Sequence, residues 1–97
     1  MAQSDAATPP EEAMPIRSRL RVQLNRRNLT RAEQGEAVLT AAELARQTGI
    51  SYGTILDLIN NRTTRIDFET LDRLMQYFGT NDLDDILEYR PPDQRQG

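Results

Sequence analysis

The chain has 97 residues, a formal net charge of −3, 37% hydrophobic residues, and neither cysteine nor histidine. This length supports one small domain, and the composition excludes disulfides, thiolate or imidazole metal sites, and catalysis by His or Cys. The longest apolar run, Ala37-Val38-Leu39, is too short for a transmembrane segment or a signal peptide, so we expect a cytoplasmic protein.

The charges are segregated along the chain. Residues 1–15 carry three acids and no arginine (net −3), residues 16–65 carry nine arginines against four acids (net +5), and residues 66–97 carry three arginines against eight acids (net −5). The chain has no lysine. Arginine suits bidentate contact with phosphate and guanine, although a GC-rich genome would equally favour it. A basic middle between acidic ends is therefore the pattern that a function has to explain.

The two ends of the chain are predicted to be disordered. Residues 1–15 are rich in Ala, Ser, Thr and Pro, and residues 91–97 have a similar composition. The folded domain is predicted over residues 16–90. Its first element is a helix over residues 16–27, because apolar residues recur every fourth position at Ile16, Leu20 and Leu24.

Two similar segments follow, ten residues apart. The run Leu29-Thr30-Arg31-Ala32-Glu33 is echoed by Leu39-Thr40-Ala41-Ala42-Glu43, and both contain a Thr-x-x-Glu capping box. The second copy is predicted to start a helix that ends at Thr48, because Gly49 tolerates a positive φ. Gly35 interrupts the first copy, so residues 30–37 are predicted as one or two weak helical turns within a longer connection.

Three more helices are predicted beyond Gly49. Ser51 caps a helix over residues 52–60, whose apolar face contains Ile55, Leu58 and Ile59. Asp67 caps the next helix, which ends at Gly79 and has an apolar side formed by Phe68, Leu71, Leu74, Met75 and Phe78. A last short helix is predicted over residues 82–89, with the side chains of Leu83, Ile86 and Leu87 facing the core. The sequence therefore predicts an all-α fold of five helices.

The stretch from Thr40 to Asn60 is the most informative. Two short helices joined by the tight turn Gly49-Ile50 form a helix-turn-helix, whose second helix fits the major groove of DNA. Small Ala45 allows the two helices to cross closely. The structural alternative is a plain helical hairpin within a small bundle.

Residues 15–92 resemble a Cro/repressor-type (XRE-like) helix-turn-helix domain of small bacterial transcription regulators. The resemblance is carried by the runs Ile16-Arg17-Ser18-Arg19-Leu20, 42–55, 60–74 and Ile86-Leu87-Glu88-Tyr89. It implies a five-helix repressor-like DNA-binding domain with a role in transcription regulation. The chain departs from the family pattern in having roughly ten extra residues between the first two helices, from Leu29 to Thr40.

The same resemblance implies which residues contact double-stranded DNA. With Ile55 inward, a helical wheel turns Gly53, Asp57, Asn60 and Asn61 away from the core. The predicted base-facing residues are Ser51, Tyr52, Gly53, Thr54, Leu56, Asp57 and Asn60. The predicted phosphate-facing residues are Thr40, Arg46, Gln47, Asn61, Arg62, Thr63, Thr64 and Arg65. A solvated polar loop is the alternative for Arg62, Thr63, Thr64 and Arg65.

Three base-facing residues have particular expectations. Gly53 would allow the backbone to approach DNA closely, with chance composition as the alternative. Leu56 would contact a thymine methyl group or be partly buried. Asp57 would accept a hydrogen bond from a cytosine amine or support a neighbouring arginine, and the second role is favoured.

The main expectation is a sequence-specific DNA-binding regulator, a repressor, that acts as a homodimer on a pseudo-palindrome. The last helix is expected in the dimer interface, and the alternative is that it only closes the core of the monomer. An antitoxin or co-regulator that binds a partner protein through the acidic C-terminal helix is the first alternative. The second is an interaction module that no longer binds DNA. We predict no catalytic residue, cofactor or metal, because the acidic cluster Asp82, Asp84 and Asp85 has no nucleophile or glycine-rich loop nearby.

Overall fold

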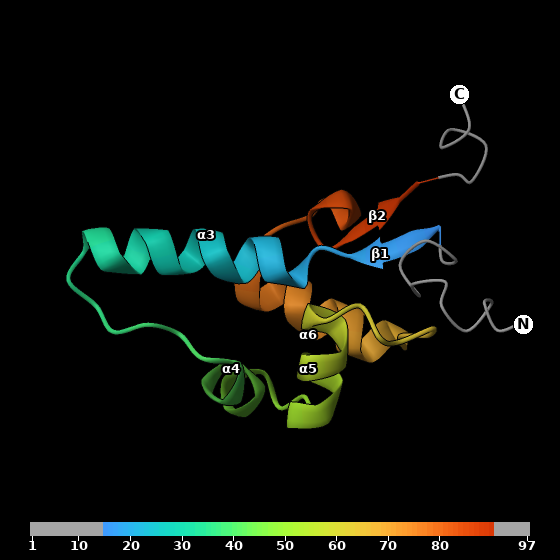
Figure 1. The fold of residues 1–97 in the computed structure, drawn as a ribbon, viewed down its shortest axis with the longest axis horizontal. Coiled ribbons are helices and arrows are strands. Elements are labelled where there is room, and N and C mark those ends of the chain that lie inside the picture. Colours follow the sequence, from blue (N-terminus) through green and yellow to red (C-terminus); the bar gives the residue numbers. More distant parts are fainter. Residues whose placement is uncertain (1–14, 91–97) are drawn as a thin grey trace, which may run out of the picture.

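The computed structural model describes residues 15–90, so the predictions for residues 1–14 and 91–97 lie outside the described part. Its elements in chain order are β1 (Ile16–Ser18), α3 (Leu20–Glu33), α4 (Ala41–Thr48), α5 (Tyr52–Ile59), α6 (Phe68–Phe78), the 3-10 turn η1 (Leu83–Asp85) and β2 (Leu87–Tyr89). Figure 1 shows α3 lying across the domain above α4 and α5, with α6 behind α5 and the two strands beside the start of α3.

The two strands correct the predicted fold class. β1 pairs with β2 in an antiparallel sheet that sets Arg17 opposite Glu88. The first helix therefore begins at Leu20 rather than residue 16, and residues 82–89 form η1 and β2 instead of a fifth helix. Leu87-Glu88-Tyr89 alternates apolar and polar residues with the period of a strand, whereas Ile16-Arg17-Ser18 has one apolar residue only and forms a strand because it pairs with that segment. Over residues 15–90 the fold is thus mostly helical, with four α-helices and a small sheet.

The two similar segments have different roles. Thr30 to Glu33 form the last turn of α3, so the prediction of separate weak turns over residues 30–37 was wrong. Thr40 does cap α4, where its Oγ1 accepts a hydrogen bond from the Glu43 amide at 3.1 Å. The first copy lies within a helix that has already begun, so the Thr30 side chain has no free amide of a helix start to cap. The connection after it is held by Asn28, which exchanges two hydrogen bonds with the backbone of Leu39.

The core lies where α3, α4, α5 and α6 meet and is closed by the C-terminal segment. Its buried residues are Leu20, Leu39, Leu44, Ala45, Ile50, Ile55, Leu58, Leu74 and Ile86. Three residues predicted to face inward do not: Ile16 is 54% exposed, Leu83 48% and Phe68 88%. Ile16 lies in a strand and Leu83 in a 3-10 helix, so neither segment has the α-helical period on which the prediction relied. Phe68 occupies the first position of α6, immediately after its cap.

The predicted helix caps are confirmed. Ser51 accepts a hydrogen bond from the Thr54 amide and Asp67 accepts one from the Thr70 amide. Gly49 and Gly79 end α4 and α6 in the left-handed conformation. Within residues 15–90, none of the helices combines the length and apolar character that a bilayer-spanning segment needs.

Candidate nucleic-acid interface

The turn between α4 and α5 is fixed by a contact from α6. Gly49 adopts φ 78°, and a Cβ at this position would lie 2.8 Å from Nη1 of Arg73. That nitrogen donates to the carbonyl oxygen of Gly49 at 3.1 Å, and Arg73 is itself held by Glu69 at 2.6 Å. Arginine at the end of α4 also complements the partial negative charge of the helix C-terminus. The geometry of the helix-turn-helix therefore depends on the positive φ that Gly49 tolerates and on the support of Arg73 from α6.

One face of α5 is buried and the opposite face is open to solvent. Ile55 and Leu58 are buried against the core. Of the residues predicted to face DNA bases, Ser51, Tyr52, Gly53, Asp57 and Asn60 are exposed, whereas Thr54 and Leu56 are half-buried. The half-burial of Leu56 agrees with the packing role considered for it. Apart from its two chain neighbours and the backbone of α5 itself, no described residue has an atom within 4 Å of a Cβ added at Gly53, so internal packing does not require glycine there.

The C-terminal end of α5 contacts the first turn of α3. Nη2 of Arg21 donates to Oδ1 of Asn60 at 2.9 Å, on the surface of the domain. The sequence predicts Asn60 at the interface but gives no sign of Arg21, because the two residues are far apart in the chain. Arg21 adds a positive charge next to the end of the exposed face of α5.

Asn61 holds the same end of α5 to the sheet. It is the only non-glycine residue with positive φ in the described range, at 54°. Its Oδ1 accepts from the Ser18 amide at 2.7 Å, and its Nδ2 donates to the Ser18 carbonyl at 3.4 Å. The side chain predicted to contact phosphate is thus engaged within the protein.

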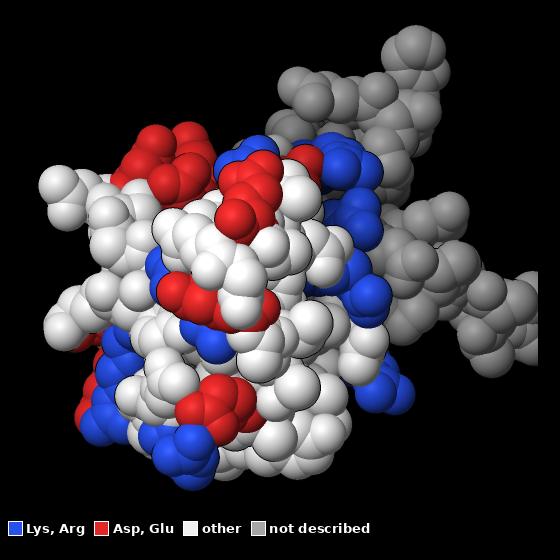
Figure 2. Space-filling view, turned by 90° about the vertical axis from the view of Figure 1, so that its left-hand side faces the viewer, with Lys and Arg blue, Asp and Glu red and all other residues white. Residues whose placement is uncertain are grey.

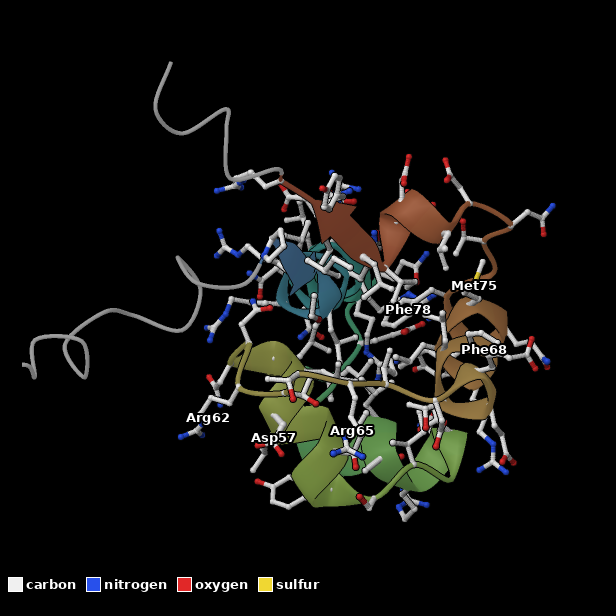
Figure 3. The ribbon with its side chains drawn as sticks, turned by 90° about the vertical axis from the view of Figure 1, so that its right-hand side faces the viewer. Asp57, Arg62, Arg65, Phe68, Met75 and Phe78 are labelled. Carbon is white, nitrogen blue, oxygen red and sulfur yellow. The ribbon has the colours of Figure 1, made fainter. Side chains whose placement is uncertain are left out.

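The segment that follows α5 presents two arginines. Arg62 and Arg65 are exposed, and neither forms an ion pair with a carboxylate of residues 15–90. Thr63 shapes the segment, because its hydroxyl donates to the Arg65 carbonyl at 2.6 Å. Asp57, although near Arg62 in Figure 3, forms no ion pair with any described arginine, so the expected support of a neighbouring arginine is not seen.

Several positive side chains lie along one edge of the molecule, and others lie beside acidic side chains at the lower left of Figure 2. Figure 2 shows a column of arginine side chains down the right-hand edge of that view and an acidic cluster at its upper left. Figure 3 looks from the opposite side, so the same edge lies on its left, where Arg62 and Asp57 are labelled. The exposed face of α5 and the arginine column therefore belong to one side of the domain.

The predicted residues of α4 form a separate group. Nε2 of Gln47 donates to Oε2 of Glu43 at 2.7 Å, and Arg46 forms an ion pair with the same carboxylate. The hydrogen bonds from Gln47 and Arg46 lower the pKa of Glu43 below its usual value, so this carboxylate stays charged and offsets Arg46. Gln47 lies beside Arg73 and Gln76 of α6 rather than beside Asn60. Thr40 is exposed at the start of α4.

These features define a helix-turn-helix domain with an exposed second helix and a flanking set of arginines. Residues 35–92 match the family of Cro/C1-type HTH DNA-binding domains. The match covers more than half of the chain, which therefore belongs to this family of DNA-binding domains. No curated protein and no solved structure matches the chain. β1 and α3 precede the matched residues, so the Arg21–Asn60 contact joins the family domain to a segment outside the match.

Proposed function

We propose that the protein is a sequence-specific, double-stranded DNA-binding transcription regulator that acts as a repressor. In this proposal α5 enters the major groove, where Tyr52, Gly53, Asp57 and Asn60 approach the base edges. The observation that carries the proposal is the exposed face of α5 flanked by Arg21, Arg62 and Arg65, none of which is neutralised by a described carboxylate. A domain that covers its operator excludes other proteins from that DNA, which is the simplest route to repression.

The phosphate contacts surround this helix in the proposal. Arg62, Thr63, Thr64 and Arg65 follow α5 directly, and Arg21 lies beside its last residue. Thr40, Arg46 and Gln47 of α4 form a second group, in which Glu43 reduces the positive charge. Asn61 contributes through its position in the backbone, because its side chain holds Ser18. Phosphate contacts orient the protein, and the residues of α5 supply the base preference.

Selection of genomic fragments by the purified protein, followed by titration of the best fragment at several salt concentrations, tests the proposed function. We expect one preferred sequence, bound in competition with unrelated DNA, and an affinity that falls as salt rises. Binding that showed no sequence preference would contradict a specific regulator, and binding insensitive to salt would contradict the arginine contacts.

We further propose that the regulator acts as a homodimer and that β2 is part of its interface. The amides of Arg19 and Arg90 bond to the carbonyls of Ile86 and Pro15, so the backbone groups of Leu87 and Tyr89 point to the outer edge of the sheet. No described residue bonds to that edge, and Tyr89 is 65% exposed. An unpaired edge strand is a template for a second strand. Sedimentation of the wild type and of Tyr89→Asp should give dimer and monomer, respectively.

A second candidate function uses the acidic C-terminal segment to bind a partner protein, as in an antitoxin or co-regulator. It is favoured by Leu83, which is 48% exposed between acidic residues that are also exposed. Purification from the native host should then yield a second protein that Leu83→Ser releases. In either case we infer a non-enzymatic protein of the cytoplasm, associated with the nucleoid.

A further inference from the structure

An apolar groove lies between β1 and the segment that carries the loop arginines. Its volume is about 270 Å³, and its apolar lining comes from Ile16, Leu58, Ile66 and Leu87. Arg17, Thr63 and Arg65 are among the polar residues around it, and none of the described residues that line it is acidic. The groove is therefore a small apolar surface with positive charge at its border.

The arginines around this groove lack acidic partners within residues 15–90. Arg17 and Arg65 line the groove, Arg62 lies in sequence between its lining residues Asn61 and Thr63, and Arg21 donates to Asn60 next to Asn61. These four form no ion pair with a carboxylate of residues 15–90, whereas the arginines that do are Arg31, Arg46, Arg73 and Arg90. Nε of Arg17 is buried and has no hydrogen-bond acceptor among the described residues, which leaves a donor that a carboxylate could satisfy. The groove and its border thus fit an acidic segment that also contains an apolar residue.

The chain itself supplies such a segment directly before the described residues. Residues 1–14 contain Asp5, Glu11 and Glu12 and no basic side chain, and they end with the apolar Met14. Ile16, two residues further on, lines the groove. Glu12 is three residues before Pro15, so an extended chain places it within roughly 10 Å of that residue. Residues 11–14 are therefore close enough in the chain to reach the groove, and their negative charge complements the arginines beside it.

We propose that residues 1–14 dock on this surface and compete with DNA for the same arginines. Met14 occupies the groove, and Glu11 and Glu12 contact the arginines at its border. The inference rests on the proposed DNA contacts of Arg62 and Arg65. It adds that a segment of the same chain regulates those contacts. A carboxylate-bearing segment held close to these arginines acts at a high effective concentration, so it weakens DNA binding most at low salt, where exposed charges interact most strongly.

The docked segment can be tested without DNA. The chain has no cysteine, so Ala7→Cys provides a single site for a spin label. We expect the label to broaden the amide signals of residues 61–66 at low salt and to leave those of residues 72–79 unaffected. The broadening should disappear in the same protein carrying Asp5→Asn, Glu11→Gln and Glu12→Gln. Equal broadening with and without the three carboxylates would overturn the proposal.

The effect on DNA binding needs a control of equal charge. We expect the Asp5→Asn, Glu11→Gln, Glu12→Gln variant to bind its DNA about three- to tenfold more tightly than wild type at low salt, with the difference lost at high salt. The control carries Glu33→Gln, Asp72→Asn and Asp84→Asn, which change the net charge equally on exposed positions elsewhere. Equal gains in both variants would overturn docking in favour of a general charge effect. If the protein showed the broadening from the spin label but bound no DNA, the docking would stand and the proposed function would be contradicted.

Discussion

Asn61 and Ser18 are 43 positions apart, yet the Asn61 side chain bonds to both backbone groups of Ser18 as a neighbouring strand would. The amide therefore covers the outer edge of β1 and fixes the end of α5 at the same time. Asparagine suits the position because it tolerates the left-handed backbone conformation that the chain needs there. The orientation of α5 thus depends on a residue whose side chain faces the protein.

Replacement of Asn61 should separate its two roles. We expect Asn61→Gly to reduce the free energy of unfolding by about 1–2 kcal/mol, because two hydrogen bonds are lost while the backbone conformation stays accessible. Asn61→Ala should cost roughly 1 kcal/mol more, owing to its positive φ. Urea unfolding measures both values. Equal stability of the two variants would contradict the argument from the backbone.

Arg62→Ala should weaken binding to all DNA sequences alike. Removal of one phosphate contact should reduce the slope of log K against log salt by about 0.9. The matched control is Arg90→Ala, which removes the same charge from an arginine paired with Glu88. Titrations on specific and random DNA at several salt concentrations provide the measurement. If the two variants gave the same slope, Arg62 would not contact phosphate.

Asn60→Ala should change the preferred DNA sequence, because Asn60 is exposed at the end of α5. Arg21→Ala should weaken binding and broaden the preference at the same position, because Arg21 donates to the Asn60 side chain. Binding selections with randomised DNA compare the two variants. An unchanged preferred site for Asn60→Ala would show that this residue does not read a base.

Gly53→Ala should have opposite effects on stability and on binding. The helix should gain about 0.5–1 kcal/mol, because alanine is the better helix former and the added Cβ meets no described atom outside α5 and its chain neighbours. DNA affinity should nevertheless fall if the backbone of α5 approaches the DNA closely at this position. Thermal unfolding and DNA titration of the same preparation test both effects. Unchanged affinity in a stabilised variant would leave Gly53 without a role in binding.

The domain should lose stability in acid through Asp67 in particular. The hydrogen bonds from Thr70, followed by the charge of Arg73, lower the pKa of Asp67. A carboxylate with a lowered pKa in the folded state stabilises the protein above its unfolded pKa, and this contribution is lost as the pH falls through the folded value. Between pH ~6 and pH ~2, wild type should therefore lose more stability than Asp67→Asn. Urea unfolding of both proteins at several pH values provides the measurement. If the free energies of unfolding of wild type and Asp67→Asn fell equally with pH, Asp67 would not contribute to the loss of stability in acid.

The sequence by itself determined the helix-turn-helix and the order of its helices. Thr40, Gly49, Ser51 and Asp67 act on amides or backbone angles within three residues of themselves, so their effect can be predicted without the fold. The exposed face of α5 followed from the same local periodicity. These positions also contain most of the residues of the candidate site.

Only the tertiary structure decided what the two ends of the domain do. Strands of three residues are not stable alone, and β1 and β2 form because distant segments pair. Residues 16–27 and 82–89 contained apolar spacings compatible with helices, so local pattern could not select the strands. The contacts Arg21–Asn60 and Ser18–Asn61 depend on that packing, because each joins residues that lie next to each other only after the chain has folded.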